Sequence, residues 1–209
     1  MAIITRELAE RGLIPPPETE AVVRRVIHTT ADFDYAQSLR FTPGAVEKGI
    51  SALRAGADIV TDTNMARAGV SRPSLEKLGG TVHCFMADPA VAEAAKSGGT
   101  TRAVASMTHA AAVCPCAVYA VGNAPTALIR LCELLAAGLR PALIIAVPVG
   151  FVNVVESKER LMAAAAQCGV PAIAAMGRKG GSNVAAAVCN ALLYTAVDAL
   201  DPAARGWQG

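Results

Sequence analysis

Arg25, His28 and Thr29 form the group of residues best suited to chemistry on an anion. The arginines at positions 24 and 25 precede His28 by four and three residues, so on a helix all three side chains share one face. Two neighbouring cations favour the neutral imidazole, whereas a bound polyanion would favour the imidazolium. Such a histidine would be a general acid that its own substrate switches on. The alternative is a solvated polar helix face.

Three polar or glycine-rich turns each follow a run that is predicted to be a strand: 122–127, 148–153 and 177–183. Ligands of a parallel sheet bind outside the carboxyl ends of its strands, where a helix N-terminus offers free N–H groups to an anion. The candidate binding residues in these turns are Asn123, Arg178, Gly180, Gly181 and Ser182. Glycines also serve ordinary tight turns. None of the turns matches G-x-G-x-x-G or the P-loop, so a nucleotide is not indicated.

The other histidines and the cysteines fit structural roles. His83 lies inside an apolar run and is expected in the core, and His109 lies late in a predicted helix, where the dipole favours a cation. The six cysteines show no zinc or iron–sulfur spacing, so we expect mostly small buried side chains and no protein-bound metal. A redox function on Cys114 and Cys116 would need an accessible thiol of low pKa. Pro115 between two apolar runs predicts burial of that pair instead.

Five apolar runs alternate with helical segments in the second part of the chain. The runs predicted as strands are 58–61, 82–86, 117–121, 143–147 and 171–175. The segments predicted as helices are 88–97, 101–112, 124–138, 156–168 and 182–198. Continuous apolar runs are typical of strands buried on both faces. The predicted class is therefore α/β, a single-domain three-layer fold with a mainly parallel sheet of about five strands flanked by helices.

The first 56 residues show a different pattern, with helices expected up to residue 10, from residue 17 and from residue 44. Prolines 15–17 end the first of these helices and open the second. We expect one domain over 1–209, with a helical N-terminal part at 1–56, an alternating core at 57–200 and a frayed tail at 201–209.

Composition narrows the classes of partner. The 209 residues carry a net charge of +2, with 53% hydrophobic and 4% aromatic residues, which argues against a nucleic-acid partner. The longest apolar stretch, 142–155, is too short for a membrane span, and no secretory leader is evident, so we expect a cytoplasmic protein with no membrane partner. Arginine supplies 14 of the 19 basic residues and binds carboxylates with a planar fork, so an anionic small molecule is the expected ligand.

Seven segments together resemble the precorrin-8X methylmutase family, which includes the cobalt-precorrin-8 methylmutases. They follow the order of the family over nearly the whole chain: RVIHTTAD at 25–32, GADIVTD at 56–62, VHCFMAD at 82–88, TRAVAS at 101–106, GNAPTAL at 122–128, PVGFVNVVESK at 148–158 and GRKGGS at 177–182. The pair GNAPTAL and PVGFV…ESK is specific. The versions at 82–88 and 33–36 are closer to the cobalt-containing branch.

The resemblance implies an isomerase of cobalamin biosynthesis without a cofactor. It would move a methyl group from C11 to C12 of precorrin-8 or cobalt-precorrin-8, giving hydrogenobyrinate or cobyrinate. The family histidine that transfers a proton to the macrocycle matches His28, and family arginines match Arg25 and Arg102. The substrate is a flat corrinoid tetrapyrrole with many carboxylates, which suit arginines and helix N-termini. The resemblance also implies a homodimer with its site near the subunit interface.

Two further expectations qualify this assignment. A non-catalytic carrier of corrinoids would need the same anion-binding turns but no acid at position 28. In addition, the family usually has a serine-containing helix start before the segment that matches residues 1–4, so we expect one substrate contact to lack a counterpart here.

Overall fold

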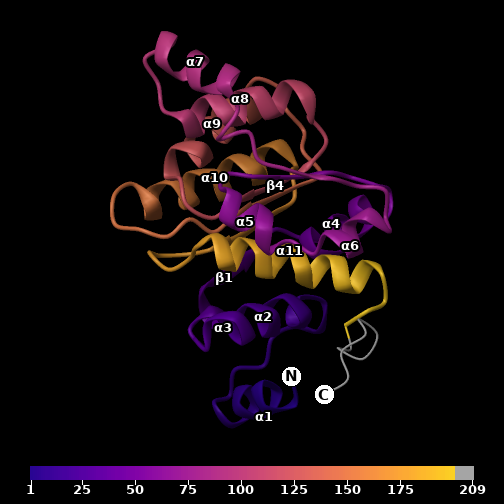
Figure 1. Cartoon of the computed structure of the whole chain (residues 1–209). Coiled ribbons are helices and arrows are strands. Elements are labelled where there is room, and N and C mark those ends of the chain that lie inside the picture. Colours follow the sequence, from indigo (N-terminus) through magenta and orange to yellow (C-terminus); the bar gives the residue numbers. More distant parts are fainter. Residues whose placement is uncertain (201–209) are drawn as a thin grey trace.

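A six-stranded sheet forms the centre of the computed structural model, which describes residues 1–200 (Figure 1). In chain order the strands are β1 (Leu39–Phe41), β2 (Ile59–Thr61), β3 (Val82–His83), β4 (Val118–Val121), β5 (Leu143–Ala146) and β6 (Ala172–Ala175). They lie side by side in the order β1-β6-β5-β4-β2-β3, and every pair is parallel except β1 with β6. The predicted α/β class with a mainly parallel sheet is confirmed. The predicted tail at 201–209 lies outside the described residues.

Helices cover both faces of this sheet (Figure 1). They are α1 (Ala2–Glu10), α2 (Pro17–Thr30), α3 (Tyr35–Ser38), α4 (Ala45–Arg54), α5 (Asn64–Gly69), α6 (Arg72–Glu76), α7 (Pro89–Ser97), α8 (Arg102–Val113), α9 (Pro125–Ala136), α10 (Val154–Cys168) and α11 (Ser182–Ala196). All the longer helices match predicted segments. The short helices α3, α5 and α6 were not predicted, because four to six residues hold too little periodicity to reveal a helix.

Alternate residues of the central strands enter two separate cores. Val118 and Ala120 of β4 belong to the core on the α11 side of the sheet, whereas Tyr119 and Val121 belong to the core formed with α8, α9 and α10. Since successive side chains of a strand point to opposite faces, burial on both faces requires an unbroken apolar run. This arrangement is the physical reason that the strands were visible in the sequence.

The N-terminal part adds a further layer and a strand. Helix α2 packs on the outer side of α11, and α1 lies beyond α2 (Figure 1). Strand β1 lies inside the segment 1–56 that we expected to be helical, and it pairs with β6 from Leu39↔Ala175 to Phe41↔Ile173. Three residues in a strand that pairs with residues about 130 positions away leave no local signal.

The predicted strand at 82–86 was too long, because β3 ends at His83. Phe85 and Met86 continue the apolar run but pack from a loop onto the core under α8 and α9. Here the apolar run predicted burial correctly but overestimated the length of the strand.

The sheet order reverses between β2 and β4. The β2–β3 connection packs its helices on the α11 face, whereas the β4–β5 connection packs α9 on the opposite face. Such a switch point opens a crevice at the carboxyl ends of the two strands, and ligands of open α/β sheets bind there. In residues 1–200, none of the helices is long and apolar enough to cross a lipid bilayer.

Candidate active site

Asp62 holds the turn between β4 and α9 in place at this switch point through hydrogen bonds. Its side chain is 1% exposed, and its carboxylate accepts hydrogen bonds from the N–H groups of Gly122, Asn123 and Ala124, each at 2.8 Å. Burial raises the pKa of Asp62, and the three N–H donors oppose that rise. The expectation that these N–H groups are free for a ligand was wrong, because an internal carboxylate already occupies them. The side chain of Asn123 is exposed and remains a candidate contact.

The turn from β6 to α11 lies directly against the turns after β4 and β5. A Cβ on Gly122 would lie 2.7 Å from Cα of Ser182, and a Cβ on Gly180 would overlap the carbonyl oxygen of Val147. Gly181 has φ of +137°, a conformation that side chains disfavour. The hydroxyl groups of Ser182 and Thr63 are 2.8 Å apart. Close packing of backbone therefore explains the glycines at 122 and 180 without a ligand.

Lys158 holds the turn between β6 and α11 in place. Its side chain is fully buried, and its ammonium group donates to the carbonyl oxygens of Gly177 at 2.8 Å and Lys179 at 2.9 Å. Burial lowers the pKa of Lys158 to about 8. The lysine of the PVGFVNVVESK segment is therefore a positioning residue that sets the turn carrying Arg178.

Arg102 lies beside the start of α9. It is the first residue of α8, directly after the cap residue Thr101, whose hydroxyl accepts from the N–H of Val104 at 3.2 Å. The hydroxyl groups of Thr101 and Thr126 are 3.4 Å apart, which ties the starts of α8 and α9 together. The start of α8, with the exposed Arg102, therefore lies beside the start of α9, which the turn with Asn123 precedes.

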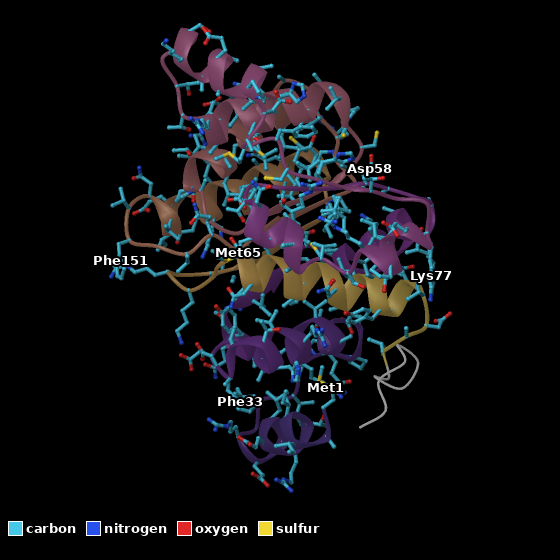
Figure 2. The ribbon with its side chains drawn as sticks, viewed as in Figure 1. Met1, Phe33, Asp58, Met65, Lys77 and Phe151 are labelled. Carbon is cyan, nitrogen blue, oxygen red and sulfur yellow. The ribbon has the colours of Figure 1, made fainter. Side chains whose placement is uncertain are left out.

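Exposed apolar side chains also follow the strands at this edge. Phe151 and Val152, in the loop after β5, are 83% and 76% exposed, and Met65, in the first turn of α5 after β2, is 72% exposed (Figure 2). The guanidinium carbon of Arg178 lies 5.4 Å from the centre of the Phe151 ring. The carboxyl edge of the sheet therefore offers apolar surface and cations together.

Helix α2 reaches this edge through the segment that follows it. The ammonium group of Lys179 lies 2.6 Å from carboxylate oxygens of both Asp32 and Asp34. His28 and Thr29 are exposed on the last turns of α2. The structure therefore links the α2 end to the 177–182 turn.

Arg25 lies away from the carboxyl edge of the sheet. Its guanidinium carbon lies 5.0 Å from the centre of the Tyr194 ring. Tyr194 is twelve residues into α11, so this ring is about 18 Å along the helix from Ser182. In a single chain the structure thus brings together Arg102, Asn123, Arg178 and Gly180–Ser182, and places Arg25 apart from them.

The structure corrects two structural assignments. His83 is half-buried beside Asp58 rather than in the core. His109 lies late in α8, as predicted, and its ring is in an edge-to-face contact with the Phe85 ring. Cys116 is exposed and Cys114 is half-buried, so the predicted burial of that pair was wrong, and only Cys132 and Cys189 are buried among residues 1–200. Burial and the charge of Asp58 raise the pKa of Cys114, opposite to the shift that a redox-active thiol needs.

Two positioning residues, Asp62 and Lys158, were missed as site residues. Both lie inside the segments that carried the family resemblance, Asp62 directly after a strand and Lys158 four residues into a helix. A charged residue directly after a buried strand was the available signal for Asp62. The burial of Lys158 had no signal, because it lies in the polar stretch ESKER at 156–160.

Comparison with known proteins assigns the family. The model of the precorrin-8X methylmutase family matches residues 1–195. The chain belongs to the precorrin-8X methylmutase family. It is therefore an isomerase of the methylmutase class, as the sequence predicted.

Individual relatives agree with this assignment. The cobalt-precorrin-8 methylmutase of Salmonella typhimurium is 45% identical over 192 residues, covering 91% of this chain and 88% of that protein. The precorrin-8X methylmutase of Pseudomonas aeruginosa is 43% identical over 178 residues, covering 85% and 84%. The crystal structure of the precorrin-8X methylmutase from Thermus thermophilus superimposes with a TM-score of 0.80 at 40% identity, covering 92% of this chain and 94% of that one.

Proposed function

We propose that this methylmutase moves a methyl group from C11 to C12 of precorrin-8 or cobalt-precorrin-8, yielding hydrogenobyrinate or cobyrinate. The observation that carries the proposal is the pairing of cations with exposed apolar side chains at one edge of the sheet. Arg102 and Arg178 suit peripheral carboxylates, and Phe151, Val152 and Met65 suit the faces of a flat macrocycle.

In the proposed reaction one carbon–carbon bond breaks and one carbon–carbon bond forms. The bond from C11 to the methyl carbon breaks as the bond from C12 forms, so the product is an isomer and no electrons enter or leave. His28 is the proposed proton donor and acceptor to the macrocycle, because an exposed imidazole near a polyanion can hold a proton that the ring needs. Arg25, Thr29, Asn123 and the Gly180–Ser182 turn are its proposed neighbours in the complex.

We propose a homodimer with the site near the subunit interface. Within one chain, Arg25 lies against Tyr194, apart from the edge that carries Arg102, whereas Asp32, four residues after His28, pairs with Lys179 at that edge. The exposed His28 would therefore be available both to its own edge and to the edge of a partner chain. The proposed location of this biosynthetic enzyme is the cytoplasm.

Visible spectroscopy tests the proposed reaction. The chain is mixed with the methylated precursor, and the absorption spectrum is followed in single turnover. Isomerisation changes the conjugation of the ring, so new bands should replace the old ones with isosbestic points. A shifted spectrum that forms at once and then stays constant would show binding without turnover, and the chain would be a carrier.

A further inference from the structure

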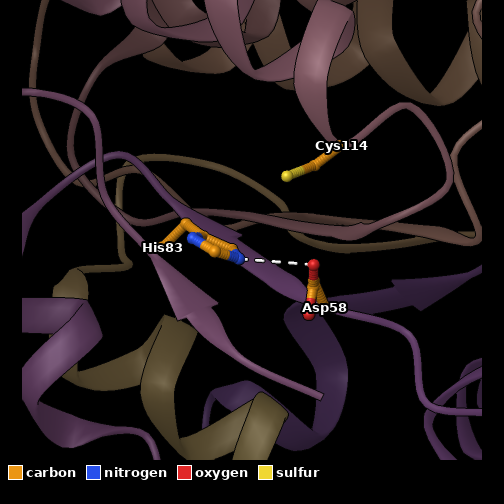
Figure 3. Close-up of side chains that lie close together, drawn as sticks. All are labelled: Asp58, His83 and Cys114. Carbon is orange, nitrogen blue, oxygen red and sulfur yellow. Dashed lines mark ion pairs between the residues drawn. The ribbon is translucent and has the colours of Figure 1, made fainter. Parts of the chain in front are cut away.

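Asp58, His83 and Cys114 converge at the edge of the sheet opposite the candidate active site (Figure 3). Asp58 directly precedes β2, His83 ends β3 and Cys114 follows α8 just before β4. Asp58 and Phe151 lie on opposite sides of the molecule in Figure 2. These three residues are separated by 25 and 31 positions in the chain, so no spacing motif reveals them, and our expectation of no metal-ligand cluster from sequence overlooked this geometry.

Their donor atoms lie close together. One ligand atom from each residue lies within 4.8 Å of the others, and Nε2 of His83 is 3.3 Å from Oδ2 of Asp58. Two ligands at about 2.0 Å from a tetrahedral ion are about 3.3 Å apart. The imidazole and carboxylate therefore already hold the separation that a shared ion requires.

Neighbouring groups orient the Asp58 and His83 side chains and hold the backbone of Cys114. The other oxygen of Asp58 accepts from the N–H of Thr81 at 2.8 Å, which leaves Oδ2 toward His83. The His83 ring stacks on Phe85 with 5.7 Å between ring centres. The hydroxyl of Tyr119 donates to the carbonyl oxygen of Cys114 at 3.0 Å. Outer contacts of this kind fix the direction of metal ligands.

We propose that Asp58, His83 and Cys114 form a binding site for one divalent transition-metal ion, with Zn²⁺ as the best match. A set of one sulfur, one nitrogen and one oxygen donor is typical of Zn²⁺ and its neighbours, whereas Mg²⁺ and Ca²⁺ require oxygen ligands. A surface cleft of about 520 Å³ runs beside Asp58, Cys114 and Cys116 and gives the ion an entry path. Water from this cleft would complete a four-coordinate ion.

The site is independent of the methylmutase reaction. It lies at the amino ends of β2 and β4, whereas Asp62 and Gly122 mark their carboxyl ends. The simpler alternative is a hydrogen bond between His83 and Asp58 with Cys114 as a bystander. The two differ in one respect: only a metal site makes the affinity for Zn²⁺ depend on all three residues.

Calorimetry with ZnCl₂ on the full chain, stripped with a chelator beforehand, is the primary test. One equivalent per chain should bind, and excess MgCl₂ should not compete. Cys114→Ser, His83→Ala and Asp58→Asn should each weaken binding by more than the ~10–100-fold that loss of an outer contact costs. The matched control is Cys116→Ser, which removes an exposed thiol from the same cleft and should keep the wild-type affinity.

Absorption with CoCl₂ gives a second readout. Cobalt bound through Cys114 should produce a thiolate charge-transfer band that Cys114→Ser abolishes and Cys116→Ser retains. Circular dichroism and turnover of Cys114→Ser should match the wild type, which separates loss of metal from loss of fold. Zinc affinity unchanged in Cys114→Ser or in His83→Ala, or lost equally in Cys116→Ser, would overturn the proposal.

Discussion

At the scale of single residues, the site combines exposed groups that can meet a ligand with buried groups that hold them. His28 and Arg102 are exposed, whereas Asp62 and Lys158 are buried and bonded to backbone. Substitution of the first kind should change turnover or affinity at constant stability. Substitution of the second kind should also change the stability of the fold.

Replacing His28 with Ala tests the proposed proton transfer. Turnover in the single-turnover assay should fall by about 100-fold or more, since that is the usual contribution of general acid–base catalysis. Product binding should persist, because the arginine and apolar contacts remain. His28→Asn should behave alike, and His109→Asn on α8 serves as the control. Near-normal rates in both His28 variants would leave this residue as a polar part of the helix surface.

Replacing Arg102 with Ala tests the anchoring of a carboxylate. Affinity for the corrinoid should fall by about 1.5–3 kcal/mol, the value of one hydrogen bond to a charged group. The loss should shrink as salt is added, because exposed charge pairs are screened. A titration of ring absorbance against enzyme concentration measures both effects. Arg72→Ala, an exposed arginine on α6, should leave affinity unchanged, and equal affinity in Arg102→Ala would exclude this residue from the site.

At the scale of elements, three turns interlock at one edge, and Lys158 on α10 supports the 177–182 turn. Burial lowers the pKa of Lys158 from 10.5 to about 8, so the folded chain loses this proton at a lower pH than the unfolded chain. Between these two values the unfolded state binds more protons. The contribution of Lys158 to the free energy of unfolding therefore rises with pH from about 8 to about 10.5.

Urea unfolding of the wild type and Lys158→Met measures this contribution. The difference in unfolding free energy, wild type minus variant, should rise with pH across that window, with a slope of up to about 1.4 kcal/mol per unit. Subtraction removes the titration of tyrosines and cysteines, which both chains share. Lys96→Met, an exposed lysine on α7, should give a flat difference. A flat or falling difference for Lys158→Met would contradict a lysine whose charge is disfavoured by burial.

The elements also show where sequence reasoning succeeds. Strands buried on both faces must be apolar throughout, so the strands at Val118–Val121 and Leu143–Ala146 could be recognised in the sequence. The glycine-rich turns were located correctly, because parallel strands place their carboxyl ends together. The hydrogen bonds from the N–H groups of Gly122–Ala124 to Asp62 could not be predicted, since they join residues about 60 positions apart in the chain. Strand β1 and the His83–Asp58 contact were missed for the same reason.

At the scale of the whole molecule, we expect a homodimer. Phe151 and Val152 are adjacent in one loop and are 83% and 76% exposed, and a contiguous exposed apolar patch is typical of a contact surface. Light scattering at micromolar concentration should report about twice the 21.3 kDa of one chain, with an interface of more than about 1,000 Å² in total. A mass of one chain would contradict this prediction.

Mixing variants tests whether the site is shared between subunits. If α2 of one chain serves the edge of its partner, re-assembled mixtures of His28→Ala and Arg102→Ala should recover about a quarter of the sites, because half of the dimers are mixed and each has one intact site. Activity at low substrate concentration is the readout. Recovery that is absent in mixtures with verified exchange of subunits would place both residues in a site made by one chain.

Asp62 also has a consequence for the release of the product. An isomerisation leaves every peripheral carboxylate of the proposed substrate in place, so whatever attracts the substrate retains the product equally. A bare helix N-terminus at the switch point would be a rigid trap for such an anion. Because Asp62 already occupies the N–H groups of the turn before α9, we expect attraction of both substrate and product to depend on the exposed side chains of Arg102 and Arg178. Release of the product would then require contacts to side chains to break, and not contacts to a rigid backbone turn.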